Sequence, residues 1–392
     1  MKPQTHIWPE EFIEAEGFVT ASATIESSDR QKLWYRVPIE YRSALSSTCD
    51  PFVVATILTV MRSGDDCVVH GEVSPSLLSN LEEFQAAWSS WRPDTYRIVP
   101  LSAESEREAE LASEGNRAIS AFSGGVDSCF TALRHRTGGC GRQQRNLEAG
   151  LMVRGFDIPL EDGDEIFERA AERSRTMLSS VGMELVPMAT NFREAIAIPW
   201  EDAFGIAIAS CLHLLQRKYT AGLIPSSYGY RALSFPYGSN PVSDPLLSSR
   251  SLEIVHDGAI AIRLEKIQAL VNWPEAIENL RVCWQGEQKD RNCGRCEKCV
   301  RNILNFRAIG AGLPSCFERD VTDDQILKLR VRGGGLDALE GLLAAIPTER
   351  ATEPWVKALK RTIRRNRAIN ALEARIPKPW KNRLRQIKKI GG

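Results

Sequence analysis

The stretch RAISAFSGGVDSCF, residues 117–130, decides the predicted fold. Residues 117–122 form a short, mostly apolar run typical of a buried strand, residues 123–128 form a glycine-rich turn, and a helical pattern begins at Cys129. A turn that joins a strand to a helix in this way presents its amide groups outward, with the positive end of the helix behind them. We therefore expect residues 123–128 to bind phosphate.

Each residue type in this turn suits contact with phosphate. The glycines let the backbone approach phosphate oxygens, the serines can donate hydroxyl hydrogen bonds, and the aspartate can hold a Mg²⁺ ion that bridges phosphates. Taken singly, each residue also fits a plain helix cap or a tight turn, and only the combination favours phosphate binding. The turn has no lysine, so it is not a Walker A loop. The predicted contacts are Ser123, Gly124, Gly125, Val126, Asp127 and Ser128.

A second glycine-rich run, GGGLD at residues 333–337, follows a charged segment and lacks both serines. We predict an ordinary loop there.

The chain after this turn alternates strand and helix patterns, which predicts an α/β fold with a doubly wound parallel sheet. Ligands of such sheets gather at the carboxyl ends of the strands, where Ser123, Arg154 and Thr190 are expected. Arg154 is predicted to contact nucleotide, although it also fits a structural cap. The predicted strands are 149–154, 185–188 and 221–224, the helices are 164–181 and 203–218, and residues 252–263 read as a hairpin turning at Asp257 and Gly258.

Residues 1–113 are predicted to form a small N-terminal α+β accessory unit, with residues 102–116 as a helical linker. The nucleotide-binding domain is then 114–310, and residues 311–392 form a helical, basic C-terminal region. The elements expected in the first part are strands 18–25, 32–38, 67–70 and 96–101 and helices 50–61 and 76–91.

Four cysteines fall within seventeen positions, at Cys283, Cys293, Cys296 and Cys299. Thiolates at these intervals can surround one tetrahedral ion, and Gly294 supplies the tight turn of a metal-binding knuckle. Zinc is the favoured ion, with an iron–sulfur cluster and unliganded thiols as the alternatives. Because four thiolates leave no open position, the ion is predicted to be structural.

The hexapeptide SGGVDS resembles the signature of the PP-loop, or N-type ATP pyrophosphatase, superfamily, and its pairing with C-x9-C-G-x-C-x2-C resembles the 7-cyano-7-deazaguanine synthase family. The resemblance covers about residues 117–306. It implies an adenine nucleotide alpha hydrolase-like fold and the use of ATP, Mg²⁺ and Zn²⁺. It also implies a ligase that cleaves ATP to AMP and pyrophosphate, adenylates a 7-deazaguanine-type carboxylate and transfers nitrogen from ammonia.

The same resemblance assigns roles to individual residues. It implies that Ser123, Asp127, Ser128 and Lys266 act in catalysis and that the four cysteines bind zinc. Because the Asp127 carboxylate would serve the metal and not the core, we expect Asp127→Ala to abolish turnover and leave the fold intact.

The chain departs from the family in two places. It reads RGFDIP at residues 154–159, where the family has a Tyr-Gly-Gln-Arg-like run, and it carries about 110 extra residues before the shared region and a basic tail after it. Extended proteins of this kind are associated with antiphage defence in bacteria, which is a further expectation for this chain.

Two other functions fit the same motifs. A tRNA-thiolating enzyme would need a persulfide-carrying cysteine outside the metal set. A catalytically silent adaptor would bind nucleotide or a partner without turnover. The candidate thiols for the first alternative are Cys129, Cys140, Cys211 and Cys316.

Residues 225–245 are rich in glycine, proline, serine and tyrosine. Some of these residue types can recognise a flat heterocycle by stacking and hydrogen bonding, namely Tyr228, Tyr230, Arg231, Tyr237, Asn240 and Asp244. An ordered surface loop is the alternative.

Charge and hydropathy set the expected location and partners. Net charge is zero, but residues 1–116 hold 9 basic and 19 acidic side chains, and residues 350–392 hold 14 and 2. A helix beginning at Pro354 and the basic run 378–389 are predicted to contact nucleic acid or an acidic protein surface. A solvated surface, or docking on the acidic N-terminal part of the same chain, is the alternative, and a second copy of the chain is a further candidate partner. The longest apolar runs are too short to span a bilayer, and the acidic first residues do not suit a secretory signal, so we expect a cytoplasmic protein.

Overall fold

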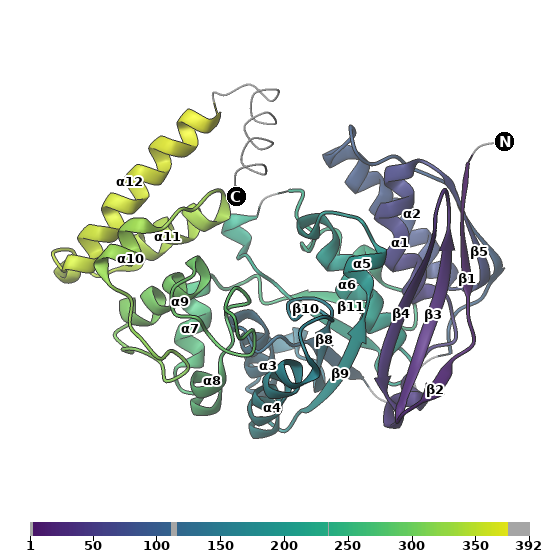
Figure 1. Cartoon of the computed structure of the whole chain (residues 1–392), viewed down its shortest axis with the longest axis horizontal. Helices are drawn as coiled ribbons and strands as arrows, with labels where there is room; N and C mark the ends of the chain where they lie inside the picture. Colours follow the sequence, from purple (N-terminus) through teal and green to yellow (C-terminus); the bar gives the residue numbers. More distant parts are fainter. Residues whose placement is uncertain (1–2, 111–115, 234, 375–392) are drawn as a thin grey trace. The chain divides into compact units, whose positions relative to one another are not determined.

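An eleven-stranded, mostly parallel sheet organises the first part of the chain (Figure 1). The structure is a computed structural model and describes residues 3–110, 116–233 and 235–374. The chain divides into two compact units, Met1–Arg291 and Asn292–Gly392, and the sheet belongs to the first. This division differs from the predicted boundaries at 113/114 and 310/311.

Five parallel strands form one half of the sheet, in the order β11-β10-β7-β8-β9. The chain starts in the middle at β7, moves outward to β8 and β9, and then returns to the other side of β7 for β10 and β11. This is the predicted doubly wound order, and the order reverses between β7 and β10. The strands are β7 (Arg117–Ala121), β8 (Asn146–Arg154), β9 (Glu184–Thr190), β10 (Ala221–Pro225) and β11 (Glu253–Asp257).

Helices cover both faces of this parallel half. Helices α3 (Val126–Arg136) and α4 (Asp164–Ser180) pack on one face, against β7, β8 and β9. On the other face α6 (Trp200–Leu214) packs together with α1 (Asp50–Ser63) and α2 (Pro75–Trp91) over a single apolar core. Strands that helices enclose on both faces need apolar side chains at most positions, so their sequences show little alternation of apolar and polar residues.

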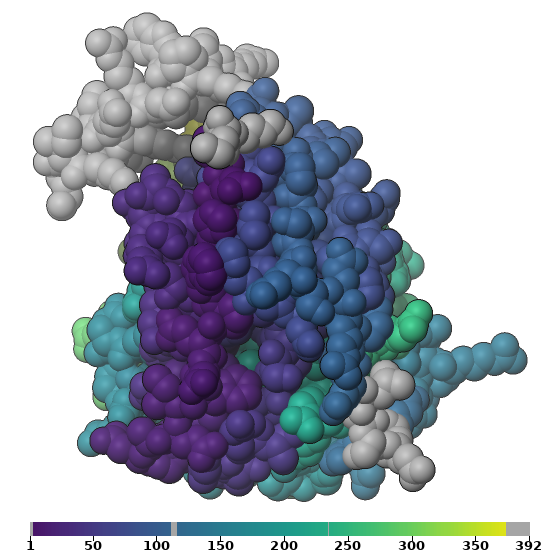
Figure 2. Space-filling model, turned by 90° about the vertical axis from the view of Figure 1, so that its right-hand side faces the viewer, coloured from purple at the N-terminus to yellow at the C-terminus, as the bar shows by residue number. Residues whose placement is uncertain are grey.

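The N-terminal strands extend the same sheet and do not form a separate one. Strand β4 pairs antiparallel with β9, with Tyr35 opposite Thr190. The Asn191 side chain accepts from the Trp34 amide at 2.9 Å and donates to the Lys32 carbonyl at 2.7 Å. The Thr190 hydroxyl, expected near a ligand, donates to the Trp34 carbonyl at 2.7 Å and so joins the same two strands. The remaining strands are β1 (Gln4–Pro9), β2 (Ile13–Ala15), β3 (Phe18–Glu26), β4 (Arg30–Pro38), β5 (Asp66–Val73) and β6 (Leu101–Glu106). Figure 2 looks onto this end of the unit, where purple and blue residues form the surface.

Three local predictions are wrong. The run at residues 333–337, predicted to be an ordinary loop, forms the start of α11 (Gly334–Ala345). The predicted hairpin at 252–263 is a single strand, β11, which lies parallel to β10 at the edge of the sheet, and Gly258 with φ +86° turns the chain toward α7 (Arg263–Leu270). The strand predicted at 96–101 lies instead at Leu101–Glu106, so the start of the predicted helical linker is extended. Residues 111–115 of that linker lie outside the described part.

The second unit is helical, as predicted. It contains α9 (Glu297–Ala308), α10 (Asp323–Lys328), α11 (Gly334–Ala345) and α12 (Pro354–Ala374), and α12 packs against both α10 and α11. The basic run 378–389 lies outside the described residues. Over the residues that are described, none of the helices combines the length and the hydropathy that a bilayer crossing requires. Two short helices of the first unit, α5 (Phe192–Ala195) and α8 (Pro274–Asn279), complete the fold.

Candidate functional site

The glycine-rich turn lies at the carboxyl end of β7, where the strand order reverses. Gly124 has φ +72°, and a Cβ there would lie 3.2 Å from the Met177 methyl group and 3.4 Å from the Ser174 hydroxyl. Its carbonyl accepts a hydrogen bond from the Arg281 amide at 2.8 Å. Both the backbone conformation and the close neighbours therefore require glycine at this position.

The turn leads directly into α3, which starts at Val126 with its side chain in the core. The first amide groups of a helix have no partner within the helix, so this end presents donors and a partial positive charge. Ser123 is exposed, whereas the Ser128 hydroxyl is buried and donates to the Gly125 carbonyl at 3.0 Å. Of the two predicted hydroxyl contacts, Ser123 is therefore the more accessible to a ligand.

Asp127 and Lys266, both predicted site residues, meet in the structure. The Lys266 ammonium donates to Asp127 Oδ1 at 2.9 Å, and the Arg263 guanidinium donates to Asp127 Oδ2 at 2.7 Å. The Lys266 side chain is only 1% exposed, and it also donates to the Ser226 carbonyl at 2.5 Å. A buried ammonium without an anionic partner is costly. The expectation that Asp127 does not serve the core is therefore wrong, because its carboxylate compensates this buried charge. Its role in holding a metal ion stays a prediction.

Two arginines of the site were not predicted. Arg263 lies one helical turn before Lys266 on α7, a spacing of three that the sequence displays. Arg281 is 7% exposed, and its guanidinium donates to the Lys289 carbonyl at 3.2 Å and lies 3.7 Å from Asp157. Its backbone supports Gly124, but nothing in the local sequence distinguishes it from any other loop arginine.

Arg154 makes its contacts elsewhere. Its guanidinium donates to the carbonyls of Leu160 and Asp162, at 2.7 and 3.0 Å, and pairs with Asp164 at the start of α4. The arginine thus holds the segment between β8 and α4. Its predicted contact with nucleotide stays a prediction.

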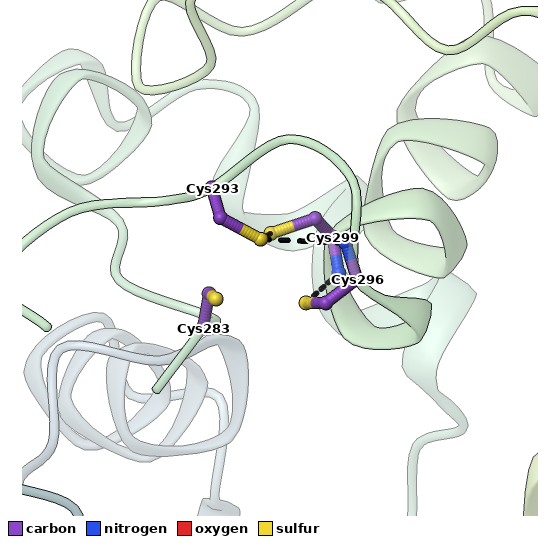
Figure 3. Close-up of side chains that lie close together, drawn as sticks. All are labelled: Cys283, Cys293, Cys296 and Cys299. Carbon is purple, nitrogen blue, oxygen red and sulfur yellow. Dashed lines mark hydrogen bonds between the residues drawn. The ribbon is translucent and has the colours of Figure 1, made fainter. Parts of the chain in front are cut away.

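The four predicted cysteines converge (Figure 3). Their sulfur atoms all lie within 4.8 Å of one another, and those of Cys293 and Cys299 are 3.8 Å apart. Tetrahedral zinc with Zn–S bonds of about 2.3 Å requires sulfur separations of about 3.8 Å. Amide groups also point at the sulfurs, with Cys299 N 3.4 Å from Cys296 Sγ and Cys296 N 3.3 Å from Cys293 Sγ. The group can therefore hold a metal ion such as zinc.

The local backbone explains this convergence. Gly294, with φ +68°, turns the chain between Cys293 and Cys296, and Cys296 is the residue that caps the start of α9. The helix then places Cys299 one turn further on. The predicted tight turn at Gly294 is confirmed.

Comparison with protein-family models, with curated proteins and with solved structures finds no match for the chain. Function is therefore inferred from the residues and their geometry.

Proposed function

We propose that the chain is an ATP-dependent ligase that cleaves ATP to AMP and pyrophosphate and adenylates a carboxylate before nitrogen transfer. The observation that carries the proposal is the arrangement at the switch point of the sheet. Gly124 brings the backbone to the amino end of α3, while Arg263 and Lys266 supply positive charge beside the Asp127 carboxylate. Such a site suits linked phosphate groups, because amides and fixed cations stabilise the charge of departing pyrophosphate.

The site can bind a magnesium–nucleotide complex if Arg263 exchanges its partner Asp127 for a phosphate oxygen. Asp127 is 20% exposed, so its carboxylate can reach a hydrated Mg²⁺ ion, which would neutralise phosphate charge when bound. The guanidinium of Arg263, 29% exposed, can turn from Asp127 to a phosphate oxygen. Lys266 is buried and stays beside Asp127, where it holds the carboxylate in position.

The proposed acceptor is a carboxylate on a 7-deazaguanine-type base, with ammonia as the nitrogen donor. Support comes from the resemblance to 7-cyano-7-deazaguanine synthases and from the four-cysteine group that accompanies the phosphate turn. Action in antiphage defence is proposed on the extended length of the chain alone.

The thiolation alternative receives less support from the cysteines. Cys129 and Cys211 are both fully buried, and burial raises the pKa of the Cys211 thiol far above its ordinary value. Burial also raises the pKa of Cys140, although its neighbour Arg134 acts in the opposite direction. A persulfide-carrying nucleophile needs an accessible thiol of low pKa.

The test is incubation of the protein with Mg²⁺, ATP and 7-carboxy-7-deazaguanine, with and without ammonium chloride. Chromatography distinguishes AMP and pyrophosphate from ADP, and mass spectrometry identifies the base. We expect acid-dependent AMP formation that Asp127→Asn abolishes. Asp337→Asn, in the second glycine-rich run, is the matched control and should retain activity. Formation of ADP would contradict the proposal, and no turnover with any acid would favour the silent adaptor.

A further inference from the structure

A buried aspartate and histidine lie next to the candidate site, with Asp244 on the loop after β10 and His256 near the end of β11. His256 Nδ1 is 2.8 Å from Asp244 Oδ2, and the two side chains are 4% and 0% exposed. Asp244 also accepts hydrogen bonds from the Ser239 hydroxyl at 2.6 Å and from the Asn240 amide at 3.1 Å. The Asp244 carboxylate accepts a hydrogen bond from Nδ1–H of His256, and this tautomer leaves Nε2 with a free lone pair.

The second ring nitrogen distinguishes His256 from His135, and Nδ1 of His213 is the other buried histidine ring nitrogen without a hydrogen-bond partner among the described residues. The Nε2 atom of His256 is buried, and within residues 3–110, 116–233 and 235–374 it has no hydrogen-bond partner. His135, the histidine of another buried aspartate pair, uses both ring nitrogens, because Nε2 lies 3.2 Å from Asp257 and Nδ1 accepts from the Arg145 amide. A purely structural histidine is expected to be satisfied in the same way.

His256 lines a small cavity together with the two tyrosines of the loop. The cavity measures about 10 Å³, which is room for one molecule of the size of water or ammonia. The rings of Tyr228 and Tyr237 lie with their centroids 5.1 Å apart. The complete lining is Tyr228, Leu233, Tyr237, Ser239, Asn240 and His256.

Short contacts connect this cavity to the phosphate turn. Lys266, which pairs with Asp127, donates to the Ser226 carbonyl, and the Ser226 hydroxyl donates to the Tyr228 carbonyl at 3.1 Å. Burial raises the pKa of Tyr237 to about 12, and the charge of Asp127 adds to that rise, so the Tyr237 hydroxyl lies within the field of the Asp127 carboxylate. The cavity is therefore a neighbour of the proposed reaction centre.

We propose that this cavity holds the nitrogen nucleophile, ammonia, and that Nε2 of His256 is the general base for its attack. The inference rests on the proposed function and adds the residue that assists its second step, the transfer of nitrogen to the adenylated carboxylate. As the nitrogen lone pair forms the bond to the acyl carbon, one N–H proton passes to Nε2. The bond from that carbon to the AMP oxygen breaks, and its electron pair leaves with AMP. The products are the amide, AMP and a protonated His256, which returns its proton to water.

Three features select a molecule like ammonia. The cavity has the volume of a single small molecule, His256 lines it and carries an unpaired Nε2, and the neighbouring tyrosine rings attract the ammonium ion, which gives a proton to water to form ammonia. Asp244 is the positioning residue, because it fixes the ring orientation and the tautomer and then stabilises the imidazolium.

The test separates the two halves of the reaction in His256→Asn. The asparagine amide can still donate to Asp244 but offers no basic nitrogen in place of Nε2. The first half is measured as exchange of labelled pyrophosphate into ATP with 7-carboxy-7-deazaguanine and no ammonia. The second half is measured as amide formation with ammonium chloride. We expect exchange within about twofold of wild type and a loss of amide formation of at least about a hundredfold, since a general base contributes about 10² to 10⁴.

Two comparisons distinguish a general base from a residue that only supports the structure. Hydroxylamine, a stronger nucleophile that is largely unprotonated at neutral pH, should restore acyl transfer in His256→Asn as hydroxamate formation. His135→Asn, at the histidine with both nitrogens occupied, should change both halves equally. Equal loss of exchange and amide formation in His256→Asn, or undiminished amide formation, would overturn the inference. If wild type shows no acid-dependent exchange, the proposed function fails first and the inference falls with it.

Discussion

Replacing Asp127 by asparagine is expected to destabilise the folded protein as well as to stop turnover. The change removes the anionic partner of Lys266, whose side chain is 1% exposed and cannot reach water without local unfolding. Removing one partner of a buried ion pair costs about 3–5 kcal/mol. Because Asp127 itself is 20% exposed, water offsets part of this loss, and we expect the lower limit, about 3 kcal/mol.

A double-mutant cycle with Lys266→Met tests the physical reason. Methionine removes the buried charge, and Arg263 still compensates Asp127 at 2.7 Å, so this single change should cost less, about 1–2 kcal/mol. In the double variant neither charge remains, and the total should fall short of the sum by about 2 kcal/mol. Urea unfolding followed by circular dichroism measures each variant. Costs that add to within about 0.5 kcal/mol would refute the reasoning, because they would show that the two charges do not stabilise each other.

Arg263→Gln is the control for the cycle. It removes the second cation beside Asp127, but the Arg263 side chain is 29% exposed, and ion pairs open to solvent contribute less than about 1 kcal/mol. A loss equal to that of Asp127→Asn would show that net charge, rather than burial of Lys266, decides stability.

Three other changes test separate parts of the structure. Cys296→Ser, or treatment with a chelator, should release one equivalent of metal and lower the melting temperature, because metal binding and folding are linked. An unchanged melting temperature in metal-free protein would show that a metal bound to the cysteines does not stabilise the fold. Gly124→Ala should lower the free energy of unfolding by about 1–2 kcal/mol, because the backbone at this position is left-handed. It should also weaken the stabilisation that Mg²⁺ and ATP give in thermal unfolding, and normal nucleotide stabilisation would contradict phosphate binding by the glycine-rich turn. Burial tends to raise the pKa of Asp257, but His135 and Arg134 lower it below its ordinary value. Its stabilising effect is therefore present above the unfolded-state pKa and lost as the pH falls through the folded-state pKa, so wild type and Asp257→Asn should converge in stability in acid.

The parallel half of the sheet was predictable because its signals are local. Apolar runs of five to nine residues alternate with long helical patterns, and Gly124 and Gly125 mark the first crossover. The position of β11 was not predictable in the same way. Asp257 and Gly258 suggest a hairpin turn, but Glu253–Asp257 finds a parallel partner in β10, and that pairing depends on residues distant in the sequence.

The site was predictable to the extent that chemistry follows from local sequence. The four cysteines and the phosphate turn each lie within one short stretch, so their residue types and spacing carry the prediction. Arg281 and His256 belong to the candidate sites only because the fold brings them there. Arg281 supports Gly124 through its backbone, and His256 pairs with Asp244 twelve residues earlier across an irregular loop. Neither residue has a distinctive neighbour pattern.

The contact between Asp127 and Lys266 connects the chemistry of the site to the stability of the fold. Lys266 is buried, so the folded chain needs an anion beside it at all times, and Asp127 supplies that anion. In the proposed function, a nucleotide that drew Arg263 toward its phosphates would leave the Asp127–Lys266 pair in place and would free Asp127 Oδ2 for a metal ion. The partly exposed arginine would then be the exchangeable partner and the buried lysine the permanent one. Arg263 and Lys266 carry the same charge, so the difference between them follows from exposure, which is 29% for the Arg263 side chain and 1% for that of Lys266.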